Sequence, residues 1–311
     1  MNARTLRRLA AVLATLVVVW VGLSALRRAR RDTEQHLTLT RFDLASVDHA
    51  RIVHGADTLS FVRHGEEWTV NGLDADPTLV HSLVAALADT APGSELVSEN
   101  AATLGALGLD SLHARWITVS RGAHTIATLL VGNEGSFGTL YVRQPGRNAA
   151  YALTNGLTDV ANRSLDGWRY KTIADVPPDS VAAVEVRRGR SGYSLRKADG
   201  KWRMGNGPAD SAAVATLLSR FSLLNADGFA TAGQADSVRR LKPQRTVRLL
   251  AAGGQPLLTV QIDSSKSGYY LLKSGDSTVY RLEDWDSAAL TPADSTLKPK
   301  PAKAAPKSRG T

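Results

Sequence analysis

The sequence predicts an α+β protein of two tandem repeats, each an antiparallel β-sheet packed with one main helix, behind a single N-terminal transmembrane helix. A strand with a tryptophan, a glycine turn and a capped helix follow one another twice, around Trp68 and around Trp202. Apolar and polar residues alternate in further segments such as 258–262, as expected for half-buried strands. An uncharged apolar run near the start of the chain predicts the membrane-spanning helix.

The apolar run covers residues 9–26 and is flanked by arginines on both sides. As a helix it would reach about 27 Å, close to the thickness of the hydrocarbon core of a bilayer. No good A-x-A cleavage site follows it, so an uncleaved anchor over residues 1–31 is expected rather than a removed signal peptide. Because both flanks are basic, charge alone leaves the orientation open, and the arginine count slightly favours a cytoplasmic C-terminal side.

The net charge of +9 does not indicate a nucleic-acid-binding protein. Seven arginines and no acids lie in residues 1–31, and five Lys or Arg against one Asp lie in residues 292–311. The residues between these ends therefore carry about −2, which is no surplus for neutralising phosphates. The chain also has no cysteine, so neither a disulfide framework nor a Cys-based metal site is expected.

The first repeat is expected at residues 32–175, beginning with a polar connector. Its main helix should begin near Asp76, because this residue stands at an N-cap position, Pro77 follows it, and apolar residues recur at helical spacing as far as residue 88. Strands are expected at 51–54, 57–63, 66–70, 116–120, 125–131, 139–143 and 149–153, and a helical segment at 155–165.

The second repeat is expected at residues 176–291, beginning at Pro177 and Pro178. Its helix should be capped by Asp210 and continue to residue 224. Strands are expected at 184–187, 193–197, 202–204, 246–250, 257–262, 269–273 and 278–282. Residues 292–311 are rich in Lys, Pro and Ala and have few apolar residues, which predicts a disordered tail.

The spacing of the repeats differs between their two halves. Trp68 and Trp202 are 134 residues apart, whereas Tyr151 and its counterpart Tyr280 are 129 apart. The second copy is therefore shorter in the connection after its helix, where loops tolerate changes of length.

No catalytic, cofactor-binding or metal-ligating residue is predicted, and no H-E-x-x-H or G-x-S-x-G motif occurs. Asp74 and Asp76 could form a pair for acid–base chemistry, but capping already explains Asp76. His54 and His64 could meet across the first hairpin, but a metal site needs further ligands. The loop GNEGSFG at 132–138 suggests phosphate binding, but it lacks a Gly-Lys-Ser/Thr ending and lies between strands, so a hairpin connection is favoured.

Tryptophans are the remaining candidates for binding residues. Trp68 and Trp202 could be stacking platforms, although their repetition favours shared packing. Trp116, Trp168 and Trp285 are candidates for contacts with a glycan or another small ligand, with core packing as the favoured alternative for each.

Several short motifs resemble the domain of unknown function 4340 (DUF4340) family over about residues 45–290. The motifs are Trp68 with Val70, Leu107-Gly108-Leu109-Asp110, Gly132 through Gly138 to Tyr141-Val142, Tyr151-Ala152-Leu153 and Arg169-Tyr170-Lys171. The resemblance implies an extracytoplasmic domain behind one N-terminal membrane span, often found with ABC transporters of the gliding-motility-associated type. It implies no catalytic residues.

The expected function is therefore that of a non-enzymatic auxiliary or scaffold protein, without a cofactor. It would be a single-pass protein of the cytoplasmic membrane with its main domain on the extracytoplasmic side, and its partner would be a membrane complex such as an ABC transporter rather than nucleic acid. The alternative is an envelope module that binds a glycan or another small ligand.

Overall fold

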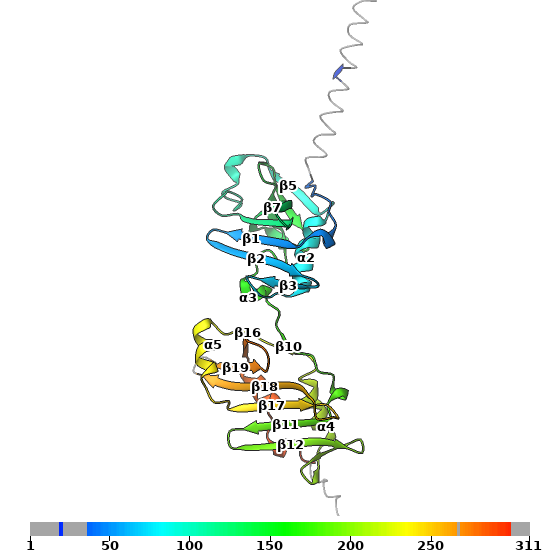
Figure 1. Ribbon diagram of the computed structural model, residues 1–311. Helices are drawn as coiled ribbons and strands as arrows, with labels where there is room; N and C mark the ends of the chain where they lie inside the picture. The colour runs from blue at the N-terminus through cyan, green and yellow to red at the C-terminus, as the bar shows by residue number, and fades with distance from the viewer. Residues whose placement is uncertain (1–18, 21–35, 266–267, 300–311) are drawn as a thin grey trace, which may run out of the picture. The chain divides into compact units, whose positions relative to one another are not determined.

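The computed structural model describes residues 19–20, 36–265 and 268–299 of the 311-residue chain (Figure 1). Two compact units divide between Tyr170 and Lys171. Each unit contains a nine-stranded sheet, and the strand pairs within both sheets are antiparallel.

The sheet of the first unit has the strand order β4-β3-β2-β1-β6-β7-β8-β9-β5. Its strands are β1 (His49–His54), β2 (Asp57–His64), β3 (Glu67–Val70), β4 (Leu73–Asp74), β5 (Gly93–Ser98), β6 (Arg115–Arg121), β7 (His124–Glu134), β8 (Leu140–Arg143) and β9 (Ala150–Thr154). Its helices are η1 (Leu44–Ser46), α2 (Pro77–Ala88), η2 (Ala101–Thr103), η3 (Ser136–Gly138) and α3 (Leu165–Trp168).

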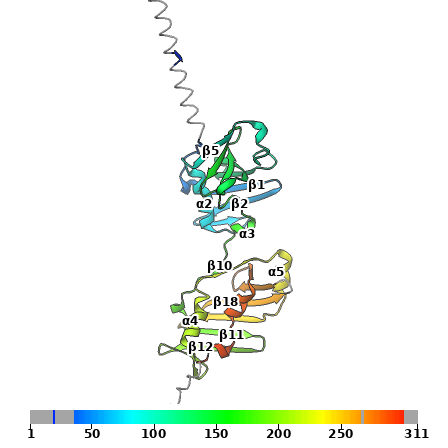
Figure 2. The same ribbon diagram turned by 180° about the vertical axis from the view of Figure 1, so that it is seen from behind.

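The core of the first unit lies between this sheet and α2, which covers one of its faces (Figure 2). The buried side of α2 presents Val80, Leu83, Val84 and Leu87, the residues whose helical spacing predicted the helix. They pack with strand residues such as Phe61. The predicted N-cap is confirmed, because the Asp76 carboxylate accepts hydrogen bonds from the backbone N–H groups of Thr78 and Leu79.

The sheet of the second unit has the strand order β14-β13-β12-β11-β17-β18-β19-β20-β16. Its strands are β11 (Ala183–Arg188), β12 (Ser191–Ala198), β13 (Lys201–Met204), β14 (Gly207–Pro208), β16 (Gly228–Phe229), β17 (Arg245–Leu250), β18 (Pro256–Ser265), β19 (Gly268–Lys273) and β20 (Val279–Leu282). A separate pair joins β10 (Thr172–Ala174) to β15 (Leu224–Asn225). The helices are η4 (Pro178–Ser180), α4 (Ser211–Ser219), α5 (Ala232–Arg239), α6 (Asp284–Leu290) and η5 (Asp294–Leu297).

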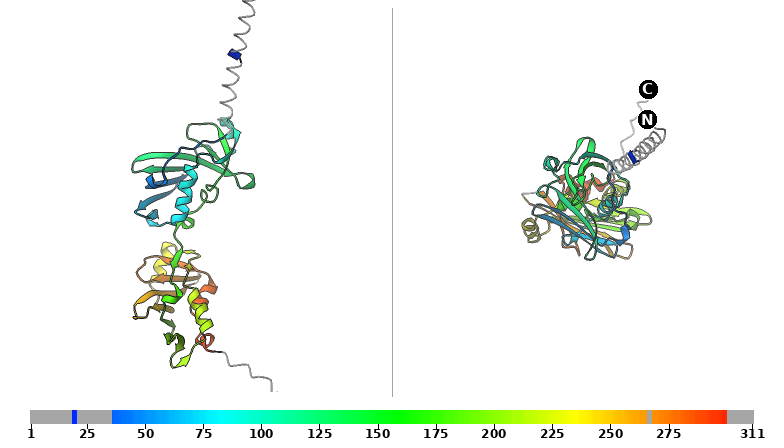
Figure 3. Two further views of the ribbon diagram at one scale, coloured as in Figure 1. Left: turned by 90° about the vertical axis from the view of Figure 1, so that its right-hand side faces the viewer. Right: turned by 90° about the horizontal axis from the view of Figure 1, so that it is seen from above.

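Helix α4 packs on the second sheet as α2 packs on the first (Figure 3). Its predicted N-cap is confirmed too, because Asp210 accepts hydrogen bonds from the N–H groups of Ala212 and Ala213. When the strands of each sheet are numbered in chain order, both sheets read 4-3-2-1-6-7-8-9-5. Two tandem repeats would require such a shared order, and the duplication itself stays a prediction.

The predicted α+β class is wrong, because the protein is mostly β. The predicted helix at 155–165 is a run of turns followed by the four-residue α3, and the predicted helix at 210–224 ends at Ser219. Edge strands that were not among the predicted ones, such as β5, extend both sheets to nine strands. Two of the edge strands, β5 and β16, are formed by pairing with the distant strands β9 and β20, so local patterns do not reveal them.

The fold class also included a membrane helix, and the part of the chain that the structure describes contains no helix long and apolar enough to span a membrane. The predicted anchor at 1–31 falls, apart from residues 19–20, outside the described residues.

Residues 292–299 are ordered, although composition assigned them to a disordered tail. Leu297 is buried in the core of the second unit, and its carbonyl oxygen accepts a hydrogen bond of 2.8 Å from the N–H of Asp210. The hydroxyl group of Tyr193 donates to the carbonyl oxygen of Pro292 over 3.0 Å. The burial of Leu297 and these two hydrogen bonds together hold the segment against the second unit.

Candidate functional site

The structure separates the two histidines that could have bound a metal and gives Asp76 a capping role. His54 lies at the end of β1 opposite Asp57, whereas His64 lies at the far end of β2, seven residues or about 23 Å along the strand. Asp74 is exposed on β4, and Asp76 caps α2. Among the described residues, no group of three or more His, Asp or Glu is arranged to hold a metal ion.

The tryptophans named as candidates occupy different environments. Trp168 is fully buried, and its ring meets that of Phe61 edge-to-face with the ring centres 4.8 Å apart, so it does not contact a ligand. Trp116 is half-buried against a small apolar cluster around Leu109. Trp202 is buried in the second core, and the half-buried Trp68 packs against the first. Of the tryptophans proposed for ligand contacts, only Trp285, which is 60% exposed, offers most of its side chain to solvent.

One carboxyl group of the second unit is buried without a counter-charge in hydrogen-bonding contact. Asp263 on β18 is 2% exposed and accepts a hydrogen bond of 2.8 Å from the backbone N–H of Gln244. Burial raises the pKa of this carboxyl above its ordinary value, and the hydrogen bond opposes the shift. A negative charge on Asp263 therefore lowers the stability of the second unit.

We expect the substitution Asp263→Asn to raise the free energy of unfolding at pH 7. A raised pKa in the folded state means that ionised Asp263 destabilises the fold above that pKa, and the penalty disappears as the pH falls through it. The advantage of Asp263→Asn over the parent protein should therefore shrink on acidification, as measured by thermal unfolding between pH 7 and pH 4. A variant less stable than the parent by the same amount at every pH would contradict this.

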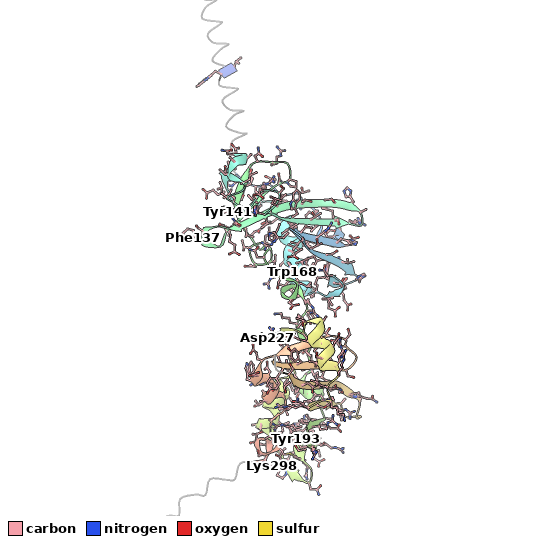
Figure 4. All side chains as sticks on the ribbon, turned by 90° about the vertical axis from the view of Figure 1, so that its left-hand side faces the viewer. Phe137, Tyr141, Trp168, Tyr193, Asp227 and Lys298 are labelled. Atoms are coloured by element: carbon pink, nitrogen blue, oxygen red, sulfur yellow. The ribbon has the colours of Figure 1, made fainter. Side chains whose placement is uncertain are left out.

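The feature that stands out on the surface is the Phe137 loop, which we define as residues 132–139, the end of β7 and its connection to β8. It contains the glycine-rich motif that resembled a phosphate loop, and the structure places it between two antiparallel strands. The side chain of Phe137 is fully exposed, at 102%, and Figure 4 shows it at the edge of the first unit, away from Trp168. An aromatic side chain left entirely in water is unusual for a residue of this type.

Hydrogen bonds close the Phe137 loop on itself. The N–H of Gly135 donates to the carbonyl oxygen of Thr139 over 2.8 Å, and both the N–H and the hydroxyl group of Thr139 donate to the carbonyl oxygen of Ser136. Phe137 itself has φ 58° and ψ 32°, the left-handed conformation, which costs a residue with a side chain about 1–2 kcal/mol. The loop is thus held in one conformation although that conformation is strained at its exposed aromatic residue.

Two glycines allow close contacts, Gly132 between the loop and the rest of the unit and Gly135 within the loop. A Cβ atom on Gly132 would lie 2.2 Å from the carbonyl oxygen of Leu107, and one on Gly135 would lie 2.4 Å from the hydroxyl oxygen of Thr139. Neither position has a positive φ, so close approach rather than backbone conformation requires glycine there.

Polar contacts fix the base of the loop. The N–H of Asn133 donates to Leu107 over 2.9 Å. The Glu134 carboxylate accepts a hydrogen bond from Asn162, whose side-chain oxygen in turn accepts one from Arg115. Phe137 therefore stands on a base tied to neighbouring segments, an arrangement suited to binding rather than to acid–base chemistry.

Sequence reasoning missed Phe137 because it judged the loop by its glycines. The pattern that could have indicated it is a single large apolar residue between glycines in a turn, because a turn between two strands rarely buries a side chain.

Comparison with known proteins identifies one family. A family model described as a domain of unknown function (DUF4340) matches residues 68–246, which is more than half of the chain and extends from β3 of the first unit to β17 of the second. No curated protein and no solved structure matches the chain.

Proposed function

The chain belongs to the domain of unknown function 4340 (DUF4340) family, and on this premise we propose that it is a non-enzymatic auxiliary or scaffold protein of the cell envelope. It is held at the cytoplasmic membrane by the apolar sequence 9–26, with its two sheet units on the extracytoplasmic side. Its partner is a membrane protein complex, such as an ABC-type transport system, and attachment to the same membrane raises the effective concentration of the two.

The observation that supports docking is the preorganised exposure of Phe137. Full burial of a phenylalanine side chain contributes about 1.5–3 kcal/mol, and aromatic residues seated in a partner's pocket often dominate the energy of an interface. Because internal hydrogen bonds already hold the loop, little conformational entropy is lost when the partner binds. The positive φ angles of Phe137 and Gly138 form the two-residue turn that returns the chain to β8. Asparagine or glycine would form this turn with less strain, so an exposed phenylalanine at this position supports a role in binding.

The composition of the Phe137 loop favours a protein partner over a lipid surface. The loop contains one carboxylate, Glu134, and no Lys or Arg. Segments that insert into the headgroup region of anionic membranes are usually basic. The complementary surface is therefore an apolar pocket of aromatic size in another protein.

The substitution Phe137→Asn tests this function, because asparagine tolerates the left-handed backbone while removing the ring. We expect affinity for the partner to fall roughly 10- to 100-fold, the equivalent of 1.5–3 kcal/mol, without a loss of thermal stability. The matched control is Leu241→Asn, which removes an exposed apolar side chain of the second unit and should leave binding unchanged.

The measurement is crosslinking in living cells from a photoreactive phenylalanine analogue at position 137, followed by identification of the captured protein. Capture of a membrane component of a transport system, lost in competition with excess parent protein but not with the Phe137→Asn variant, supports the proposal. Capture of lipid alone, or equal competition by both proteins, refutes docking through Phe137. Reporter fusions after residue 311 test the orientation separately, and a cytoplasmic reporter signal would refute the envelope location.

A second candidate function, binding of an envelope glycan or another small ligand, is favoured by the exposure of Trp285 in the second unit.

A further inference from the structure

A surface hollow of about 380 Å³ surrounds Trp285 in the second unit. It is formed by the end of α4, the segment 223–227 and the first turn of α6. The side chains that matter for its chemistry are those of Arg220, Leu223, Asn225, Asp227, Trp285 and Asp286. None of them belongs to the Phe137 loop, so the hollow is independent of the docking proposed above.

The indole ring of Trp285 is the platform of this hollow. The guanidinium carbon of Arg220 lies 5.7 Å from the centre of the ring, a distance at which the cation is attracted to the ring face. Leu223, which is 64% exposed, lines the same hollow. Trp285 and Leu223 thus expose two large apolar surfaces in the same hollow, whereas protein surfaces ordinarily expose apolar residues singly.

The first unit shows that the fold does not require this tryptophan. The spacing of 129 residues that relates Tyr151 to Tyr280 makes Gly156 the counterpart of Trp285. The spacing of 134 residues that relates the two main helices makes Ala86 the counterpart of Arg220. The correspondence is spatial as well, because a Cβ atom on Gly156 would lie 4.0 Å from the Cβ atom of Ala86.

In both units the end of the main helix contacts the segment that follows the last long strand. Ala86 and Gly156 make this contact in the first unit, and Arg220 and Trp285 make it in the second. Packing is satisfied by the small pair in the first unit. If the two units are repeats, the fold does not need large side chains at this contact, and those of Trp285 and Arg220 are available to a ligand.

Planar polar side chains surround the platform. The Asp227 carboxylate is held by Arg281, whose Nε and Nη2 atoms lie 2.9 and 2.7 Å from Oδ2. The side-chain oxygen of Asn225 accepts a hydrogen bond from the hydroxyl group of Thr172, which orients the amide and leaves its NH₂ group as a donor. Asp286 is partly buried beside Arg220, and burial raises its pKa, while Arg220 lowers it and Asp227 raises it.

The charges select the class of ligand. A cationic ligand would meet the positive charge of Arg220, whose guanidinium carbon lies 5.7 Å from the ring centre, while the ring itself stays 60% exposed. An anionic ligand would meet the carboxylates of Asp227, Asp286 and Glu283. A neutral ligand with an apolar face and several hydroxyl groups suits an indole surrounded by carboxylate, amide and guanidinium groups, because each of these groups donates or accepts hydrogen bonds in a plane.

We propose that the hollow beside Trp285 binds a neutral saccharide, with a pyranose ring stacked on the indole and its hydroxyl groups bonded to Arg220, Asn225, Asp227 and Asp286. The volume of about 380 Å³ lies within the range of small-ligand sites. This gives the second unit a binding site of its own in addition to the docking loop of the first.

The test is a titration of the full-length protein, in a detergent without a sugar headgroup, with methyl β-glucoside, cellobiose and N,N′-diacetylchitobiose. The readout is the indole N–H signals in the nuclear magnetic resonance spectrum. We expect one of these saccharides to shift one signal saturably, and this signal to be absent in Trp285→Ala. Affinity should fall at least about tenfold in Trp285→Ala, and also in Arg220→Ala, which takes the residue of the first unit.

Tetramethylammonium chloride and sodium phosphate serve as cationic and anionic probes, and Phe137→Asn is the matched control that should bind the saccharide as the parent does. Saturable binding of either ion with no response to the saccharides would overturn the proposal. The same would follow if no saccharide shifted an indole signal at tens of millimolar, or if Trp285→Ala bound the saccharide with unchanged affinity by calorimetry.

Discussion

Replacing Trp168 with alanine is expected to lower the free energy of unfolding of the first unit by about 3–5 kcal/mol. Trp168 is fully buried on α3, packs with the core of the unit and meets Phe61 edge-to-face at 4.8 Å. Its carbonyl oxygen also accepts a hydrogen bond of 2.8 Å from the N–H of Asp76, next to the start of α2. Removal of the ring would leave a large cavity where the last segment of the unit closes over the sheet.

The substitution Trp168→Phe separates packing from hydrogen bonding. The indole Nε1 of Trp168 is buried and has no hydrogen-bond partner among the described residues, which costs stability. Phenylalanine keeps an aromatic ring against Phe61 and removes this unpaired N–H, so its cost should be well below that of alanine. An equal loss in the two variants would show that the ring does not carry the stability of this segment.

Hydrogen exchange followed by mass spectrometry is the suitable measurement, because two units need not unfold together and a single melting temperature would mix them. Amides of β1, β2 and α2 should lose protection in Trp168→Ala, and amides of β17 and β18 serve as the internal reference. Unchanged protection in the first unit would contradict the prediction.

Replacing Gly132 with alanine is expected to destabilise the first unit by about 2–3 kcal/mol. The added Cβ atom would lie 2.2 Å from the carbonyl oxygen of Leu107 and 3.0 Å from the carbonyl carbon of Gly108. Both are backbone atoms, so rotation of a side chain does not relieve the overlap. Either β7 or the segment before Asp110 has to move, which would weaken the hydrogen bond from Asn133 to Leu107.

The matched control for this change is Gly233→Ala in α5. No atom lies within 4 Å of a Cβ atom on Gly233, and the residue is helical, so alanine should leave stability unchanged or increase it by up to about 1 kcal/mol. Denaturant unfolding of both variants, with hydrogen exchange to assign the unit, gives the comparison. Equal stability of the two variants would show that the contact between Gly132 and Leu107 is not tight in solution.

Gly132→Ala should also affect binding of the partner, because Gly132 lies at the base of the Phe137 loop. If the base of the Phe137 loop shifts, the ring is no longer presented in one position, so capture of the partner should decrease although Phe137 is intact. The predicted loss is smaller than that of Phe137→Asn, because the aromatic side chain remains available to the partner.

The family resemblance noted in the sequence was confirmed, whereas the membrane and transporter associations that it implies remain proposals. The fold class was predicted less well. The strand β5 was not predicted, because it forms only through β9, more than fifty residues away. The segment 155–165 has apolar residues that favoured a helix, but Leu157, Val160 and Ala161 are buried from a series of turns.

The sequence by itself determined the features that depend on neighbouring residues. Asp76 and Asp210 cap their helices because a carboxylate two or three residues before an N–H needs no distant partner. Asn71-Gly72 and Asp199-Gly200 turn the chain with positive φ for the same local reason.

Only the tertiary structure decided which aromatic residues are available for binding. Trp168 and Trp285 cannot be told apart by composition or periodicity, yet one fills the core of its unit and the other stands over an open hollow. The base of the Phe137 loop is fixed by contacts of Gly132 and Asn133 with Leu107, about 25 residues away in the chain. Exposure is a property of what surrounds a residue, and for these three residues the surroundings come from distant parts of the chain.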